Sequence, residues 1–191
     1  MKSISIFSLI LTALLLFACS PQKSNEAETA GNTTDSKPAS TKPANDALII
    51  TAKTFRGITL GDKIDAHSDY VAKDILKTGE GDFDIFRVKD ANGNSLGYIM
   101  PDPGDENIVG DITVESPMAT TVDGIKVGMT WADLLKAIPG IEVHGSEIEG
   151  RTYARHEGIM YRLDSSNYTY ELDPSKVALN AAILEIVVWG K

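Results

Sequence analysis

Residues 124–138, GIKVGMTWADLLKAI, contain the strongest local structural signal in the chain. Thr130 is placed to cap the backbone amide of Asp133, whose carboxylate can reach back to the Thr130 amide, as in a capping box. Apolar residues then follow at helical spacing and line one face: Trp131, Leu134, Leu135 and Ile138. Pro139-Gly140 ends the pattern. This stretch predicts a short amphipathic helix that begins after Thr130 and packs on a core.

The glycine-flanked motif before this helix occurs twice in the chain. Residues 57–61, GITLG, match residues 124–128, GIKVG, and each copy is followed by a candidate helix, alternating segments and a closing apolar strand. The first candidate helix lies within residues 62–77, where an apolar stripe is formed by Ile64, Val71, Ile75 and Leu76. We therefore expect one globular domain over residues 47–191, with two similar halves of about 47–116 and 117–191.

The segments between these motifs predict strands. Residues 84–89 and 95–100 flank Asn92-Gly93, a dipeptide that favours a tight reverse turn between two antiparallel strands. Residues 151–155 and 158–163 form a second hairpin candidate. Adjacent strands with two interspersed helices predict an α+β fold, with an antiparallel sheet and two helices on one face.

The N-terminus has the three parts of a secretory signal peptide. Lys2 supplies the positive charge, residues 4–17 are apolar, and the small residue Ala18 precedes Cys19. The apolar run is shorter than the about 20 residues that a membrane-spanning helix needs. We expect residues 1–18 to be a signal peptide. Leu16-Phe17-Ala18-Cys19 is similar to the lipobox of bacterial lipoproteins, and this resemblance implies a lipoprotein signal with the lipid on Cys19.

Residues 20–46 differ sharply in composition from the rest of the chain. They contain no Val, Ile, Leu or aromatic residue and are rich in Ser, Thr, Asn, Ala, Lys and Pro. Such a segment cannot bury enough apolar surface to offset the loss of chain entropy. We therefore expect residues 19–46 to be a lipidated cysteine followed by a disordered tether.

Charge, cysteine content and missing motifs argue against several classes of partner and chemistry. The formal net charge is −9, which opposes binding to nucleic acid and to anionic headgroups, so that membrane association would depend on the lipid. Cys19 is the only cysteine, which excludes a disulfide within the chain. The histidines show no metal-binding spacing, and no catalytic motif is present. The sequence predicts no catalytic residue, metal site or cofactor.

One predicted strand carries a candidate binding surface. Arg151, Tyr153 and Arg155 alternate along it, so their side chains would project from one face. Together with Arg162 they would form a cationic and aromatic patch suited to a carboxylate, a phosphate or a partner protein. The alternative is that the arginines pair with three nearby glutamates, Glu147, Glu149 and Glu157.

The end of the signal segment, Leu16-Phe17-Ala18-Cys19, resembles the lipobox of bacterial lipoproteins. This resemblance implies cleavage before Cys19, a diacylglyceryl group on its sulfur and acylation of its amine. In enterobacterial lipoproteins an aspartate after the cysteine retains the protein in the inner membrane. Ser20 therefore implies the outer membrane, with the domain on the periplasmic face.

The folded part also resembles a known family. Residues 111–114, 124–134 and 183–189 are similar to segments of enterobacterial outer-membrane lipoproteins of unknown function that are regulated by the envelope-stress sigma factor (sigma-E). Residues 127–130 before a helix are more distantly similar to the small lipoprotein of the barrel-assembly machinery. Neither resemblance supplies catalytic residues.

The sequence thus predicts a lipid-anchored outer-membrane lipoprotein that serves as a non-enzymatic binding or envelope-maintenance module. We expect the membrane, through the lipid, and an envelope protein as partners, and no nucleic acid. The alternative, a periplasmic hydrolase-like enzyme with an unrecognised active site, stays open. The sequence does not indicate the oligomeric state of the protein.

Overall fold

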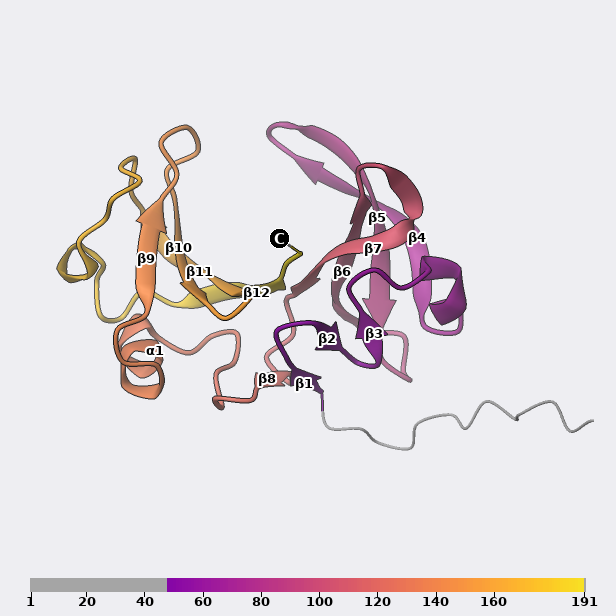
Figure 1. The fold of residues 1–191 in the computed structure, drawn as a ribbon, viewed down its shortest axis with the longest axis horizontal. Helices are drawn as coiled ribbons and strands as arrows, with labels where there is room; N and C mark the ends of the chain where they lie inside the picture. Colours follow the sequence, from indigo (N-terminus) through magenta and orange to yellow (C-terminus); the bar gives the residue numbers. More distant parts are fainter. Residues whose placement is uncertain (1–47, 191) are drawn as a thin grey trace, which may run out of the picture. The chain divides into compact units, whose positions relative to one another are not determined.

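A computed structural model describes residues 48–190, so the predicted signal peptide, Cys19 and the tether lie outside the described residues. Its main feature is an eight-stranded antiparallel sheet of order β4-β5-β6-β7-β12-β11-β10-β9 (Figure 1). The strands are β4 Val71–Thr78, β5 Gly81–Lys89, β6 Ser95–Asp102, β7 Asp105–Val114, β9 Glu142–Gly145, β10 Arg151–His156, β11 Ile159–Ser166 and β12 Ile183–Val188.

A second, smaller sheet has the order β3-β2-β1-β8, and its β1 and β8 are parallel. Its strands have two residues each: β1 Ile49–Ile50, β2 Thr54–Phe55, β3 Ile58–Thr59 and β8 Thr120–Thr121. The helical elements are α1 Trp131–Ala137 and two 3₁₀ turns, η1 Ile64–His67 and η2 Pro174–Lys176. The described residues all belong to one compact unit.

The large sheet has the same arrangement on both sides of its centre. Two runs of four strands, β4–β7 and β9–β12, meet where β7 pairs with β12. The pairs Val114–Ile186 and Ile112–Val188 lie symmetrically around the pair Thr113–Val187. The two inner strands therefore continue one hydrogen-bonded ladder across the domain.

The predicted α+β fold with two helices is wrong, because strands dominate the described structure. The helix after Thr130 is confirmed, but the helix expected within residues 62–77 is replaced by η1 and the strand β4. Val71 and Ile75 are four positions apart, a spacing that places side chains on one face of a helix and also of a strand. Pairing of β4 with β5 along its whole length selects the strand.

The core lies on one face of the large sheet, against α1 and the small sheet. Trp131 and Leu134 of α1 are fully buried there, as predicted from their spacing. Phe55 and Ile58 of the small sheet and Tyr161 of β11 belong to the same apolar cluster. Alternate residues of the strands face this core, which leaves the opposite face of the large sheet for other contacts.

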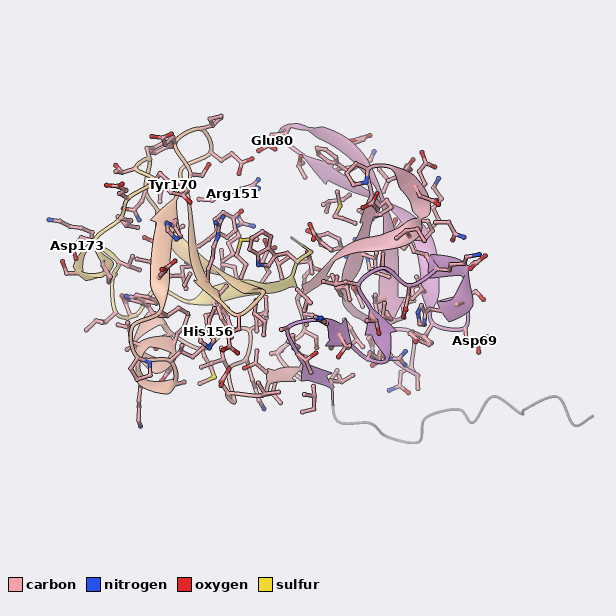
Figure 2. All side chains as sticks on the ribbon, in the orientation of Figure 1. Asp69, Glu80, Arg151, His156, Tyr170 and Asp173 are labelled. Atoms are coloured by element: carbon pink, nitrogen blue, oxygen red, sulfur yellow. The ribbon has the colours of Figure 1, made fainter. Side chains whose placement is uncertain are left out.

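The opposite face of the large sheet is concave, and we call it the concave face. Ile85, Tyr98 and Val187 are buried on it although they lie outside the core cluster. Glu80, in the β4–β5 turn, lies 3.3 Å from Arg151 of β10 (Figure 2). A flat sheet would hold β5 and β10 about 24 Å apart. The sheet must therefore curve strongly for the two side chains to meet.

Candidate functional site

The three residues of the predicted binding surface lie on one face of β10. Arg151, Tyr153 and Arg155 are partly exposed, whereas Thr152 and Ala154 between them are fully buried. The three side chains therefore project from the concave face, as the alternation along the strand requires. Their surroundings differ from one residue to the next.

Arg151 is neutralised by acidic side chains. Its guanidinium lies 3.1 Å from a Glu149 carboxylate oxygen and 3.3 Å from one of Glu80. Pairing with Glu149 is the alternative that the sequence offered for this arginine. Arg151 therefore joins β10 to the β4–β5 turn and is occupied by contacts within the domain.

Two other arginines of the concave face also have acidic partners. Arg162 of β11 lies 3.6 Å from Glu185 of β12. Arg87 of β5 contacts Asp74 and Glu115, each at 3.1 Å. Burial raises the pKa of Glu115, and the positive charge of Arg87 opposes that shift. This part of the sheet is therefore a network of internally compensated charges.

Arg155 is the exception on this face. Within residues 48–190 no carboxylate lies within 4.0 Å of its guanidinium, and its buried Nε has no hydrogen-bond partner. The guanidinium carbon lies 5.4 Å from the centroid of the Trp189 ring, a cation–π contact. The pairing with Glu157 considered from the sequence is not found. Arg155 is thus held by an aromatic ring and not by an acid.

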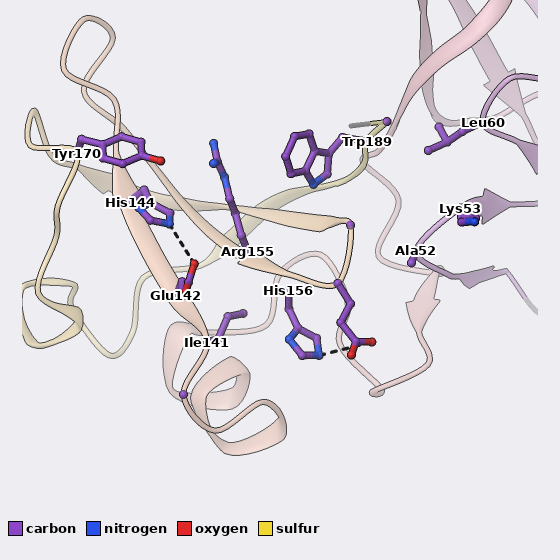
Figure 3. Close-up of a pocket in the computed structure, with 14 residues that line it drawn as sticks. Ala52, Lys53, Leu60, Ile141, Glu142, His144, Arg155, His156, Tyr170 and Trp189 are labelled. Atoms are coloured by element: carbon purple, nitrogen blue, oxygen red, sulfur yellow. Dashed lines mark ion pairs between the residues drawn. The ribbon is translucent and has the colours of Figure 1, made fainter.

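Arg155 lies in a groove of about 900 Å³, which we call the Arg155 groove (Figure 3). The side chains that matter for its chemistry are Lys53, Glu142, His144, Arg155, His156, Glu157, Tyr170 and Trp189. His144 of β9 stacks on Tyr170, with ring centroids 4.8 Å apart and an angle of 26° between the planes. Figure 3 shows Arg155 between this pair and Trp189.

The β10–β11 hairpin forms one side of the groove. Its two-residue loop, Glu157-Gly158, has positive φ at both positions (46° and 82°), as a type I′ turn requires. The hairpin predicted from the sequence is confirmed, with its turn one residue later than the expected His156-Glu157. A Cβ on Gly158 would lie 3.2 Å from the carbonyl oxygen of Ala52, so glycine lets the hairpin tip approach the β1–β2 turn closely.

Buried polar atoms without partners concentrate in this groove. Among the described residues four such atoms occur, and three belong to groove residues: His144 Nδ1, Arg155 Nε and Trp189 Nε1. The fourth is the Tyr161 hydroxyl in the core, where burial raises its pKa to about 12. An unpartnered buried donor costs about 1–3 kcal/mol. The groove therefore holds polar groups that the domain itself does not satisfy.

The two carboxylates of the groove lie beside its histidines. Glu142 is 3.7 Å from His144 Nε2, and Glu157 is 4.0 Å from His156 Nε2. Both distances exceed that of a hydrogen bond. Within residues 48–190, no group of three or more His, Cys, Asp or Glu side chains is arranged to hold a metal ion. In the same residues no helix has the length and apolarity needed to span a membrane.

Beside the groove, a half-buried acid fixes the C-terminal end of the described chain. Asp111 of β7 accepts a hydrogen bond of 3.1 Å from the backbone amide of Gly190. Burial raises the pKa of Asp111, and this hydrogen bond opposes the shift. Because Trp189 precedes Gly190, the contact also restrains the indole that packs on Arg155.

Sequence reasoning missed three residues of the groove: His144, Tyr170 and Trp189. His144 faces Tyr153 across the β9–β10 pair, so a correct sheet order would have placed it beside the predicted surface. Tyr170 reaches the groove from the segment after β11, and Trp189 from the end of β12. No local sequence signal joins these three positions.

Comparisons with known proteins identify a similar fold but no family. The sequence matches no known protein-family description, and no curated protein matches it. Among solved structures, the chain is similar to the uncharacterized protein yfeY from Escherichia coli, with 13% identity and a TM-score of 0.51. The match covers 74% of this chain and 99% of that chain. The chain thus shares the fold of an uncharacterized enterobacterial protein.

Proposed function

We propose that this protein is a lipid-anchored module on the periplasmic face of the bacterial outer membrane that binds an envelope partner without catalysing a reaction. Its anchoring is supported by the signal segment before Cys19 and by the composition of residues 20–46. Its binding function is supported by one observation above all. Arg155 is the arginine of the concave face without a carboxylate within 4.0 Å among residues 48–190.

An uncompensated arginine favours a partner that brings a negative charge. The chain has a net charge of −9, and the groove lining holds two basic and two acidic side chains, so the unpaired positive charge beside Trp189 is local to Arg155. Arginine is suited to such contacts because its guanidinium donates parallel hydrogen bonds and loses hydration readily. A partner that supplies acceptors would bond to the terminal guanidinium nitrogens, which are not among the buried polar atoms that lack a partner.

The alternative of a hydrolase-like enzyme is less well supported by the groove. In a catalytic dyad the base is oriented by a group within hydrogen-bond reach, at about 2.6–3.2 Å and often somewhat longer in a ligand-free site. The histidine–carboxylate distances of 3.7 and 4.0 Å in the groove are longer. Neither carboxylate is hydrogen-bonded to its histidine in this structure, whereas the unpaired guanidinium of Arg155 is a feature that favours binding.

Anchoring is tested by metabolic labelling with palmitate, followed by membrane fractionation. Wild-type protein should incorporate the label and sediment with the outer membrane. The Cys19→Ala variant should do neither. Equal labelling of the two proteins would overturn the anchoring proposal, and labelling confined to the inner membrane would overturn the location.

Binding is tested by crosslinking in intact cells from a photoreactive residue at position 170, in the groove. A photoreactive residue at position 148 is the control, because Ile148 is 91% exposed and does not line the groove. Position 170 should yield an adduct that position 148 lacks and that Arg155→Gln abolishes. An adduct that survives Arg155→Gln, with the fold checked by circular dichroism, would place the partner elsewhere.

A further inference from the structure

Resting on the binding function proposed above, we infer that the Arg155 groove receives an oxyanion, a carboxylate or a phosphate, that is joined to a ring. Arg155 would bind the oxyanion, and the aromatic side chains beside it would hold the ring. This inference names the chemistry of the ligand, which the proposed function leaves open.

No acid among the described residues occupies the guanidinium of Arg155. Figure 3 shows the Arg155 side chain directed into the groove, between His144 and Trp189. The Nε atom is buried, but the two terminal Nη atoms are not among the buried polar atoms that lack a partner, and within residues 48–190 no acid pairs with them. Carboxylates and phosphates both accept two parallel N–H bonds from a guanidinium. The oxyanion class therefore matches the unused donors.

One acid of the domain is placed to compete for this arginine, and it is turned away. Glu142 of β9 lies directly opposite Arg155 in the β9–β10 register. Its side chain is 78% exposed and approaches His144 at 3.7 Å. Because directly opposite residues of a sheet are neighbours, Glu142 would neutralise Arg155 if it turned toward it. Its actual orientation leaves the guanidinium for an external anion.

The walls of the groove favour a ring as the body of the ligand. Trp189 lies on one side of Arg155, and the stacked pair of His144 and Tyr170 lies on the other. Flat rings stack well on such side chains. The groove volume of about 900 Å³ is within the range of small-molecule sites. An acid that lacks a ring would use only part of this surface.

The two tryptophans provide a direct readout of binding. The Trp131 indole is fully buried in the core and donates to the carbonyl oxygen of Pro174 at 3.4 Å, whereas the Trp189 indole lies in the groove without an acceptor among the described residues. The mature chain, labelled with ¹⁵N-tryptophan and kept in detergent, should give two indole signals. Occupation of the groove should move the Trp189 signal and leave that of Trp131 unchanged.

Five probes separate the contributions of charge and ring. Benzoate and phenyl phosphate carry both, acetate and inorganic phosphate carry the charge alone, and benzyl alcohol carries the ring alone. We expect benzoate or phenyl phosphate to shift the Trp189 signal at lower concentration than the other three. The tighter of the two identifies the ligand group as carboxylate or phosphate.

Variants then assign the effect to the named residues. Arg155→Gln should weaken binding about tenfold or more, because it removes a charge-assisted hydrogen bond. Arg162→Gln is the matched control on the neighbouring strand and should leave the affinity unchanged. Glu142→Gln should leave it unchanged or raise it, since the internal competitor is gone.

The inference would be overturned by a Trp189 signal that none of the probes moves, or by equal binding of benzoate and benzyl alcohol. Unchanged affinity in Arg155→Gln would do the same. These failures are distinct from failure of the proposed function. If a partner is crosslinked but the Trp189 signal does not respond to the probes, the binding function stands and the oxyanion site is rejected. If the Trp189 signal responds but no partner is crosslinked, the ligand site stands and the envelope partner is rejected.

Discussion

Replacing Arg155 by methionine should stabilise the folded protein, because this arginine is held at an energetic cost. Its buried Nε lacks an acceptor among residues 48–190, which costs about 1–3 kcal/mol. Its cation–π contact with Trp189, at 5.4 Å, stabilises the folded state by about 0.5–1 kcal/mol and offsets part of that cost. Methionine retains an apolar stem for packing and brings no donor. We therefore expect the free energy of unfolding to rise by about 1 kcal/mol.

The assay is urea unfolding of the mature chain in detergent, followed by near-ultraviolet circular dichroism. Arg162→Met is the matched control, because it leaves Glu185, whose side chain is 17% exposed, without its arginine. That variant should lose about 1–3 kcal/mol. The slope of free energy against urea should stay the same in both variants. If Arg155→Met destabilises the protein as much as Arg162→Met, Arg155 is a structural residue and the reasoning fails.

Three further predictions concern the fold and its pH dependence. Thr130→Ala should lower the free energy of unfolding by about 1 kcal/mol, since it removes the cap on the amide of Asp133; unchanged stability in urea would contradict this. Gly97→Ala should lower it by about 3 kcal/mol, because φ is +147° and a Cβ would lie 2.0 Å from the carbonyl oxygen of Thr113. A midpoint of urea unfolding equal to wild type would contradict this expectation. The raised pKa of Asp111 means that its contribution favours the folded state at low pH and is lost as the pH rises through the folded pKa. Asp111→Asn keeps an acceptor for the Gly190 amide and carries no charge, so relative to wild type it should gain more stability at pH 7 than at pH 4. An equal change in the free energy of unfolding between the two pH values in wild type and variant would contradict this.

The parts of the fold that depend on neighbouring residues were predictable from the sequence. The Thr130 amide donates to Asp133 at 2.9 Å and the Asp133 amide donates to Thr130 at 3.2 Å, which confirms the capping box. The turn at Asn92-Gly93 joins β5 to β6, as expected from its residues. Such signals act over a few positions, and nothing distant overrides them here.

The first helix was predicted wrongly because its evidence was ambiguous. The spacing of Val71 and Ile75 suits both a helix and a strand, and the deciding factor is the neighbouring strand β5. That stripe had candidate caps at Asp62 or Ser68 and a candidate end at Gly79, but it lacked the capping box that marks the second helix. Long-range pairing therefore decided the structure of this segment.

The candidate site, too, has one part that follows from local sequence and another that depends on long-range pairing. That Arg151, Tyr153 and Arg155 share a face follows from the alternation of a strand. That Arg151 is paired, partly with a residue 71 positions away, whereas Arg155 is not, depends on the curvature and order of the sheet. The position of Trp189 beside Arg155 depends on them too. The sequence could therefore indicate the surface but not which arginine remains available.

The most direct test of the central claim is an experimental structure of the lipidated protein purified from its own membranes. We predict additional density within hydrogen-bond distance of the Arg155 guanidinium, in contact with Trp189. Glu142 should remain turned toward His144, as it is in the present structure. An Arg155 guanidinium paired with Glu142, or with any other carboxylate of the chain itself, would contradict the account.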